Sequence, residues 1–391
     1  MPRTYLETLK EIANLPTAPF MEGCVADYIT GFVAQRPQLR VKADRFGNLL
    51  VKYTPRSVSK VRPKGRPILF AAHMDHPGFI AGKMVDANHL QAEWHGGVQS
   101  RYFKNTRIRF YAAGRWIPAT IEKVLPQKRK KGDIRAAGDV PPEAVIARVK
   151  AAVPPGSLGM WNIPDAVIRG NRFFARVTDD LSGLAAIICM LDDLCRNKAE
   201  CPCYAFFTRA EEVGFVGALA AVDGKTIPQK TIIVAVENSS VIPGVTMGAG
   251  PILRVGDKSS VFTPAATAYC QIVADKLAGK DKSFRYQRKL MDGGSCESTA
   301  YCQYGYDATC ICLPLVNYHN MDRTRRKIAP ESVDVRDYLN LVKWFIALAK
   351  SPAKLRYDDR NPELGKKLDA LLRQHRQRLL ETGGRNTAIR Q

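Results

Sequence analysis

Three things are scarce or missing in this sequence: a long apolar run, a disulfide framework and negative charge. No apolar run approaches the ~20 residues that a membrane-spanning helix needs, and residues 1–7 lack the apolar core of a signal peptide. We therefore expect a cytoplasmic protein without a membrane partner. Apolar residues make up 46% and charged residues 25% of the 391 residues, a globular balance with room for two domains or for one domain with an insertion.

The ten cysteines do not occur at the spacings of a secreted disulfide framework. Several lie in apolar stretches, as Cys189 and Cys310 do, where a free thiol behaves as a small hydrophobic side chain. Cys201 and Cys203 are separated by one residue, rather than by the two of a redox or zinc-binding motif. We expect reduced, structural cysteines, as in a reducing compartment.

Acidic residues number 37 against 59 basic ones, which gives a net charge of +22. Part of the excess is concentrated in residues 128–131 and in the tail after Pro352. Such clusters can bind nucleic acid or anionic surfaces, or they can be a solvated loop and a solvated helix face. No aromatic residues alternate with the basic ones, as a stacking surface for bases would require. We therefore expect no nucleic-acid partner.

The pattern along the chain divides it into four segments. Residues 1–79 alternate helical and extended patterns, and form the first part of a catalytic domain. Residues 80–171 contain short alternating segments between Gly, Pro and charged turns, which predicts an inserted, small β-barrel-like domain. Helix and strand patterns alternate again over 172–352, the second part of the catalytic domain, and 353–391 form a basic helical tail. The alternation predicts an α/β fold with a mostly parallel or mixed sheet flanked by helices.

Acidic and imidazole side chains follow the predicted strands, where ligands gather in open α/β sheets. They are His73 and Asp75 after strand 67–72, Asp179 before a helix, Glu211 and Glu212 after strand 203–208, Glu237 at the end of strand 231–236, and His319 after strand 308–313. Taken alone, Asp179 could be a helix N-cap, and Glu211 and Glu212 could complement a helix dipole. These separate explanations do not account for the occurrence of such residues at successive strand ends.

A two-metal hydrolytic site needs this set of side chains. Two divalent ions ~3.5–4 Å apart require a bridging carboxylate, with imidazole or carboxylate ligands on each side. Zinc accepts His nitrogen and carboxylate oxygen and keeps a position open for water, and a further carboxylate must move protons. The residues therefore predict two divalent metal ions, zinc being favoured, with cobalt or manganese as alternatives.

The order of these motifs resembles that of the co-catalytic metallopeptidases of clan MH. The motifs are His73-Met74-Asp75, Asp179-Asp180-Leu181-Ser182-Gly183, Glu211-Glu212-Val213-Gly214, Glu237 and His319. Within the clan, residues 1–350 most resemble the tetrahedral, or glutamyl, aminopeptidases. The resemblance implies an enzyme that hydrolyses N-terminal residues from peptide substrates, and a homo-oligomer formed through the inserted β domain.

The resemblance also implies a role for each residue. His73 and Glu237 would hold one ion, and Glu212 and His319 would hold the other. Asp179 would bridge the two ions. Glu211 would be the general base and acid, and Asp75 would orient His73. The bond between Asp179 and Asp180 would be cis.

Three departures from the family pattern leave alternatives open. Glu237 occupies a position that is usually Asp in these aminopeptidases, whereas Glu is more frequent in related carboxypeptidases and deacylases. The glycine-rich loop 292–297 carries Cys296 and Glu297 in place of the usual pair, and the segment around His319 lacks an arginine often found there. The alternatives are a carboxypeptidase or N-acyl amino acid deacylase of the same clan, and a non-catalytic metal-binding scaffold with anionic partners. The preferred substrate residue stays open.

Overall fold

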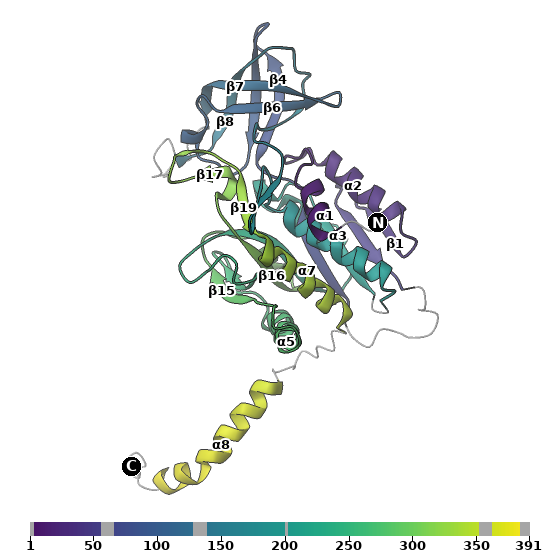
Figure 1. The fold of residues 1–391 in the computed structure, drawn as a ribbon, viewed down its shortest axis with the longest axis vertical. Helices are drawn as coiled ribbons and strands as arrows, with labels where there is room; N and C mark the ends of the chain where they lie inside the picture. Colours follow the sequence, from purple (N-terminus) through teal and green to yellow (C-terminus); the bar gives the residue numbers. More distant parts are fainter. Residues whose placement is uncertain (1–3, 56–65, 128–138, 200–201, 352–361, 384–391) are drawn as a thin grey trace.

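A computed structural model describes residues 4–55, 66–127, 139–199, 202–351 and 362–383. The predicted basic loop at 128–131 lies outside the described residues, as do parts of the tail. The described chain forms a helix-covered sheet, a small barrel beyond one end of it, and a separate C-terminal helix (Figure 1). No helix within the described ranges has the length and apolarity needed to cross a membrane.

An eight-stranded mixed sheet forms the centre of the molecule. Its strands, in spatial order, are β1 (Leu39–Ala43), β2 (Leu49–Tyr53), β12 (Cys203–Thr208), β3 (Ile68–His73), β13 (Ile232–Ser240), β16 (Asp307–Leu315), β14 (Ile252–Asp257) and β15 (Gln287–Met291). The central strands β12, β3, β13 and β16 run parallel, whereas β1, β2 and β14 pair antiparallel with their neighbours towards the centre. The predicted α/β fold with a mostly parallel or mixed sheet is confirmed.

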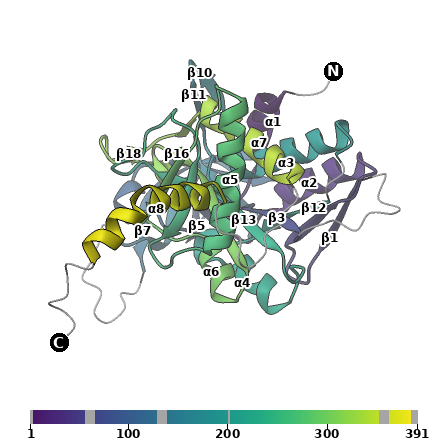
Figure 2. The ribbon, with the colours of Figure 1, turned by 90° about the horizontal axis from the view of Figure 1, so that it is seen from below.

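Helices cover both faces of this sheet (Figure 2). They are α1 (Tyr5–Ile12), α2 (Gly23–Ala34), α3 (Leu181–Arg196), α5 (Pro264–Lys280) and α7 (Val335–Lys350) on one face, and α4 (Val216–Asp223) and α6 (Glu297–Gln303) on the other. Strand β3 shows why both faces are filled. Phe70 belongs to the core under the first group, and its neighbours Leu69 and Ala71 belong to the core under the second. Successive side chains of a strand point to opposite faces, so a continuous apolar run needs cover on both.

The predicted barrel-like insertion is a closed, six-stranded barrel with a core of its own. Its strands, in order around the barrel, are β4 (Gly78–Met84), β5 (His89–His95), β8 (Pro142–Val149), β7 (Arg115–Pro126), β6 (Arg107–Ala112) and β9 (Leu158–Trp161). Four rings fill part of the core, with centroids between 4.6 and 6.0 Å apart: Phe79, Trp94, Phe103 and Trp161.

Smaller elements connect the barrel to the main sheet. A three-stranded sheet consists of β10 (Val167–Arg169), β11 (Arg172–Ala175) and β19 (Glu331–Asp334). A short hairpin is formed by β17 (Met321–Asp322) and β18 (Lys327–Ile328). The last helix, α8 (Pro362–Gly383), extends away from the body, and its residues 366–377 are exposed (Figure 1).

Candidate metal centre

The main sheet brings all seven predicted site residues to the carboxyl ends of its parallel strands. His73 is the last residue of β3. Glu211 and Glu212 open the short 3-10 helix η3 (Glu211–Val213) after β12, and His319 lies in η4 (Tyr318–Asn320) after β16. The predicted end of a strand at Glu237 is wrong, because the ladder between β13 and β16 continues to Ser240.

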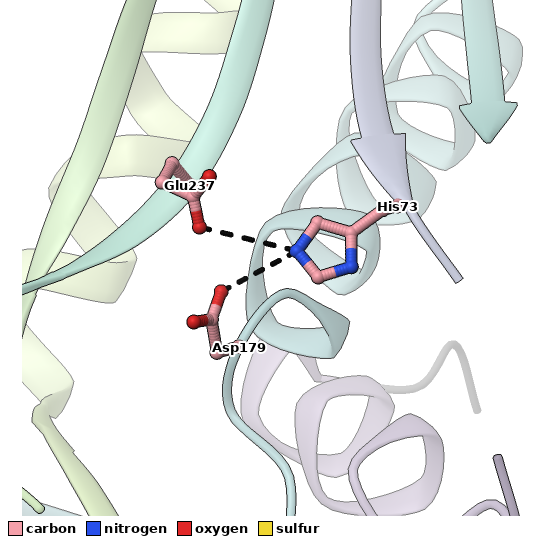
Figure 3. A group of neighbouring side chains, drawn as sticks. All are labelled: His73, Asp179 and Glu237. Carbon is pink, nitrogen blue, oxygen red and sulfur yellow. Dashed lines mark ion pairs between the residues drawn. The ribbon is translucent and has the colours of Figure 1, made fainter. Parts of the chain in front are cut away.

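His73, Asp179 and Glu237 form the first cluster (Figure 3). The Nε2 atom of His73 lies 3.5 Å from Oδ1 of Asp179 and 3.9 Å from Oε1 of Glu237. All three side chains are buried. These atoms face a common point, as ligands of one ion would.

Asp179, Glu212 and His319 form the second cluster. The Nε2 atom of His319 lies 2.9 Å from Oε2 of Glu212 and 3.7 Å from Oδ2 of Asp179. Asp179 therefore turns one carboxylate oxygen towards each histidine. That is the geometry of a carboxylate that bridges two ions.

Unsatisfied atoms in the two clusters test whether metal ions fit. Among the described residues, His73 Nε2, Asp179 Oδ1 and Glu212 Oε1 are buried and have no hydrogen-bond partner. Buried carboxylates without partners are costly unless a cation neutralises them. Nitrogen and carboxylate oxygen are ligands that zinc accepts. The donor set and its missing partners therefore fit two divalent cations.

Asp75 contacts both the first histidine and the segment after β12. The Nδ1 atom of His73 donates to the backbone carbonyl of Asp75 at 3.1 Å and lies 3.5 Å from its carboxylate. In the neutral imidazole, this hydrogen bond makes Nε2 the nitrogen without a proton, and Nε2 points at the cluster. The Asp75 carboxylate accepts the backbone N–H groups of Glu211 at 3.0 Å and Glu212 at 3.1 Å.

Glu211 is a buried carboxyl group outside both pairs of predicted ligands, although it also forms a group with His73 and Glu212 that could hold an ion. Burial raises its pKa well above the ordinary value, and the nearby carboxylates of Glu237 and Glu212 raise it further. A raised pKa makes the carboxylate of Glu211 a stronger base towards the proton of a water molecule. Burial and the same carboxylate neighbours also raise the pKa of Asp179.

Glu331, which the sequence patterns did not single out, holds both parts of the centre together. One of its carboxylate oxygens accepts the backbone N–H groups of Thr178 at 2.7 Å and Asp179 at 3.1 Å. The other accepts the backbone N–H of His319 at 2.9 Å. The sequence shows only an acidic residue in a short segment. Its importance becomes visible in the structure, where all four residues of β19 are buried.

Two further features complete the surroundings of Asp179. The peptide bond between Asp179 and Asp180 is cis, which confirms what the family resemblance implied. His76 donates from Nδ1 to the backbone carbonyl of Asp179 at 2.7 Å. This hydrogen bond helps to fix the backbone of the proposed bridging residue.

Known proteins resemble this chain in sequence. A model of the family described as M42 glutamyl aminopeptidase matches residues 56–334. A putative aminopeptidase from Acetivibrio thermocellus is 24% identical over 318 residues, which cover 78% of this chain and 87% of that protein.

Solved aminopeptidase structures share the fold. An aminopeptidase from the archaeon Desulfurococcus kamchatkensis superposes with a TM-score of 0.70 at 21% identity, covering 88% of this chain and 94% of that one. The TET1 peptidase of Pyrococcus horikoshii has a TM-score of 0.69 at 21% identity, covering 88% and 99%. The predicted family and the class of metal-dependent aminopeptidases are thus confirmed: the chain belongs to the M42 glutamyl aminopeptidase family.

Proposed function

We propose that this protein removes N-terminal residues from peptides by hydrolysis at a centre of two divalent ions. His73 and Glu237 would hold one ion, and Glu212 and His319 would hold the other. Asp179 would bind both ions. The observation that carries the proposal is the position of Asp179, whose two carboxylate oxygens lie 3.5 Å and 3.7 Å from the two histidines.

The chain's own groups supply the proton transfer. When bound, the ions lower the pKa of water and polarise the scissile carbonyl. Glu211 accepts the proton of the attacking water and returns it to the departing amine. Its raised pKa suits both steps, since an ordinary carboxylate is a weaker base. Asp75 keeps the backbone of Glu211 in place through the hydrogen bond of 3.0 Å.

A peptide digest followed by mass spectrometry tests the proposal. Mixed short peptides, half of them N-acetylated, are incubated with protein loaded with zinc, cobalt or manganese. We expect loss of single residues from free N-termini only, and the most active metal identifies the preferred ion. Cleavage at C-termini or removal of the acetyl group would favour the carboxypeptidase or deacylase alternative. Inertness with every metal would favour the scaffold alternative.

The variant Glu211→Gln tests the proposed base. We expect bound metal to be retained and turnover to fall by about 10²-fold or more, because the amide cannot take up a proton. Glu93→Gln, on an exposed residue of the barrel, is the matched control and keeps full activity. Full activity of Glu211→Gln would exclude Glu211 as the base.

Assembly and location are further parts of the proposal. A dodecamer is described for the related PhTET1 structure, and this supports a homo-oligomer. The family resemblance leads us to propose the β4–β9 barrel as its interface. The cysteines in the described part of the chain are free thiols, which suits a cytoplasmic protein because that compartment keeps thiols reduced. Size measurement of the full chain by light scattering tests the first statement, and fractionation of cells tests the second.

A further inference from the structure

Two arginines from distant parts of the chain meet where the barrel joins the main sheet. Arg109 lies on β6 of the barrel, and Arg176 follows β11 in the segment that leads to Asp179. The guanidinium carbon of Arg109 lies 4.1 Å from the centre of the Trp116 ring, and that of Arg176 lies 5.6 Å from the same point. One aromatic ring thus contacts two groups of like charge.

Both guanidinium groups are largely withdrawn from water. The side chain of Arg176 is 1% exposed, and that of Arg109 is 14% exposed. Arg176 donates to the backbone carbonyls of Asn14 at 3.0 Å and Ile163 at 3.4 Å. These neutral acceptors orient the group but do not balance its charge. Three further nitrogens are buried and have no hydrogen-bond partner among the described residues: Nε of Arg176, and Nε and Nη2 of Arg109.

One carboxylate lies near the two arginines, and it is poorly placed to balance them. Oδ1 of Asp165 is 3.7 Å from Nη2 of Arg109 and 3.8 Å from Nη1 of Arg176, too far for a hydrogen bond to either. The Asp165 side chain is 72% exposed, so solvent screens its charge. Within the described ranges, no other ion pair involves Arg109 or Arg176. Two positive charges therefore face one exposed negative charge.

The excess positive charge persists at physiological pH. Burial and, to a lesser degree, the neighbouring charge of Arg109 lower the pKa of Arg176 to about 9, which is still above neutrality. Buried charges are costly unless they are paired. Because both arginines have a nitrogen within 4 Å of the same Asp165 oxygen, one small ion can approach both of them.

We propose that Arg109 and Arg176 bind a small monovalent anion, chloride or an ion of similar size. A single negative charge balances the excess, and the unpartnered N–H groups supply the donors. The bound ion would tie β6 of the barrel to the segment that carries Asp179. The backbone carbonyl of Arg176 also accepts Nδ2 of Asn320 at 2.9 Å, so the same ion would hold the segment next to His319. The proposal does not depend on the proposed peptidase function.

Anomalous scattering from bromide locates the site. The full chain, loaded with zinc, is crystallised in the presence of bromide as the probe for chloride. We expect an anomalous peak within hydrogen-bonding distance of nitrogens of both arginines. A water molecule or the Asp165 carboxylate in that position, without an anomalous peak, would overturn the proposal.

Thermal unfolding of the metal-loaded protein measures binding in solution. Potassium chloride replaces potassium gluconate stepwise at constant ionic strength. The wild-type protein is compared with Arg109→Gln, Asp165→Asn and the control Arg107→Gln, whose exposed residue lies on the same strand. We expect the melting temperature of the wild-type protein to rise to a plateau, by about 2–4 °C at about ten times the dissociation constant.

The variants assign this rise to the two arginines. Arg109→Gln should lose it, and Arg107→Gln should keep it. Asp165→Asn should show a larger rise, because the competing carboxylate is gone. An unchanged rise in Arg109→Gln would place the ion elsewhere, for example on the metal ions, and would overturn the proposal. A bromide peak without any effect of chloride on the melting temperature would mean binding at crystal concentration only, and this would overturn it as well.

Discussion

The carboxylate of Asp75 accepts the backbone N–H of Glu211 at 3.0 Å. Its second oxygen accepts the backbone N–H of Glu212 at 3.1 Å, and its backbone carbonyl accepts from Nδ1 of His73. One residue thus fixes the proposed base and a proposed ligand of each ion. These hydrogen bonds tie the segment from the end of β3 to Asp75 to the turn after β12.

The variant Asp75→Asn should lower metal affinity and turnover together. An amide offers one acceptor and one donor group where two N–H groups need acceptors, so the turn carrying Glu211 and Glu212 shifts. We expect about 10- to 100-fold weaker metal binding, the usual effect of losing a residue behind a ligand, measured by competition with a chelator.

Asp337→Asn is the matched control for that experiment. Asp337 is also a buried carboxylate that accepts two backbone N–H groups, those of Gly248 and Gly250, each at 2.7 Å. It belongs to neither metal-ligand cluster. If both variants lose metal to the same degree, the effect comes from general loosening of the protein and not from Asp75.

The variant Glu237→Gln should reduce the number of tightly bound ions from two to one. His73 and Asp179 remain in the first cluster, but the loss of a negative ligand weakens that site, whereas Glu212 and His319 keep the second. Titration calorimetry and elemental analysis after dialysis measure the change. His319→Asn should weaken the other site reciprocally, and loss of both ions in either variant would contradict separate sites.

That the proposed ligands lie close together was predictable from the sequence because His73, Glu212 and His319 lie at or after strand ends, and the carboxyl ends of parallel strands meet at one edge of a sheet. His73, at the end of a wholly buried strand, is the clearest case. Glu331 was not predictable in this way. It acts through backbone N–H groups of distant segments, and such partners leave no spacing in the sequence.

Arg323 shows a second limit of sequence reasoning. It is one of several basic residues in a polar turn, and only the fold places Arg323 and Glu237 together on the wall of a cavity of about 210 Å³. The length of β13 was misjudged for a related reason, since pairing with β16 extends the strand past the charged residue. The change from apolar to polar residues at Glu237 predicted the end of the strand, but the hydrogen bonds to β16 continue to Ser240.

The variant Gly183→Ala should destabilise the protein and disturb the centre. Gly183 lies in the first turn of α3, where an added methyl group would collide with the Asp180 carboxylate and the Val236 side chain. We expect a loss of about 1–3 kcal/mol in the free energy of unfolding, as for other overpacked sites, measured by denaturant titration.

The variant Gly279→Ala is the control for Gly183→Ala, because Gly279 also lies in a helix. Gly279 lies near the end of α5, with open space where a methyl group would be added. Alanine favours the helix, so we expect a gain of up to about 1 kcal/mol. A similar loss in both variants would show that steric contact around Gly183 is not the cause.

Because of Asp337, the free energy of unfolding should depend on pH. Burial raises the pKa of Asp337 from 3.8 to about 6. Between these two values the unfolded chain binds fewer protons at this group than the folded protein does, so its contribution to stability is greatest at low pH and falls as the pH rises towards 6.

Denaturant titrations of the metal-free protein and of Asp337→Asn measure this dependence. The stability of the wild-type protein relative to the variant should decrease from pH 4.5 to pH 6.5 and then level off. The difference between the two proteins isolates this one group from the other carboxylates. A constant difference across that range would rule out a raised pKa.

The position of the barrel in the chain has a mechanical consequence. Strand β4 begins at Gly78, shortly after His73, and the chain leaves the barrel at Trp161 and returns through β10 and β11 to Asp179. Both connections therefore end at residues of the first metal cluster. A displacement of the barrel relative to the sheet would therefore move the segments that carry His73 and Asp179 more directly than it would move the helices.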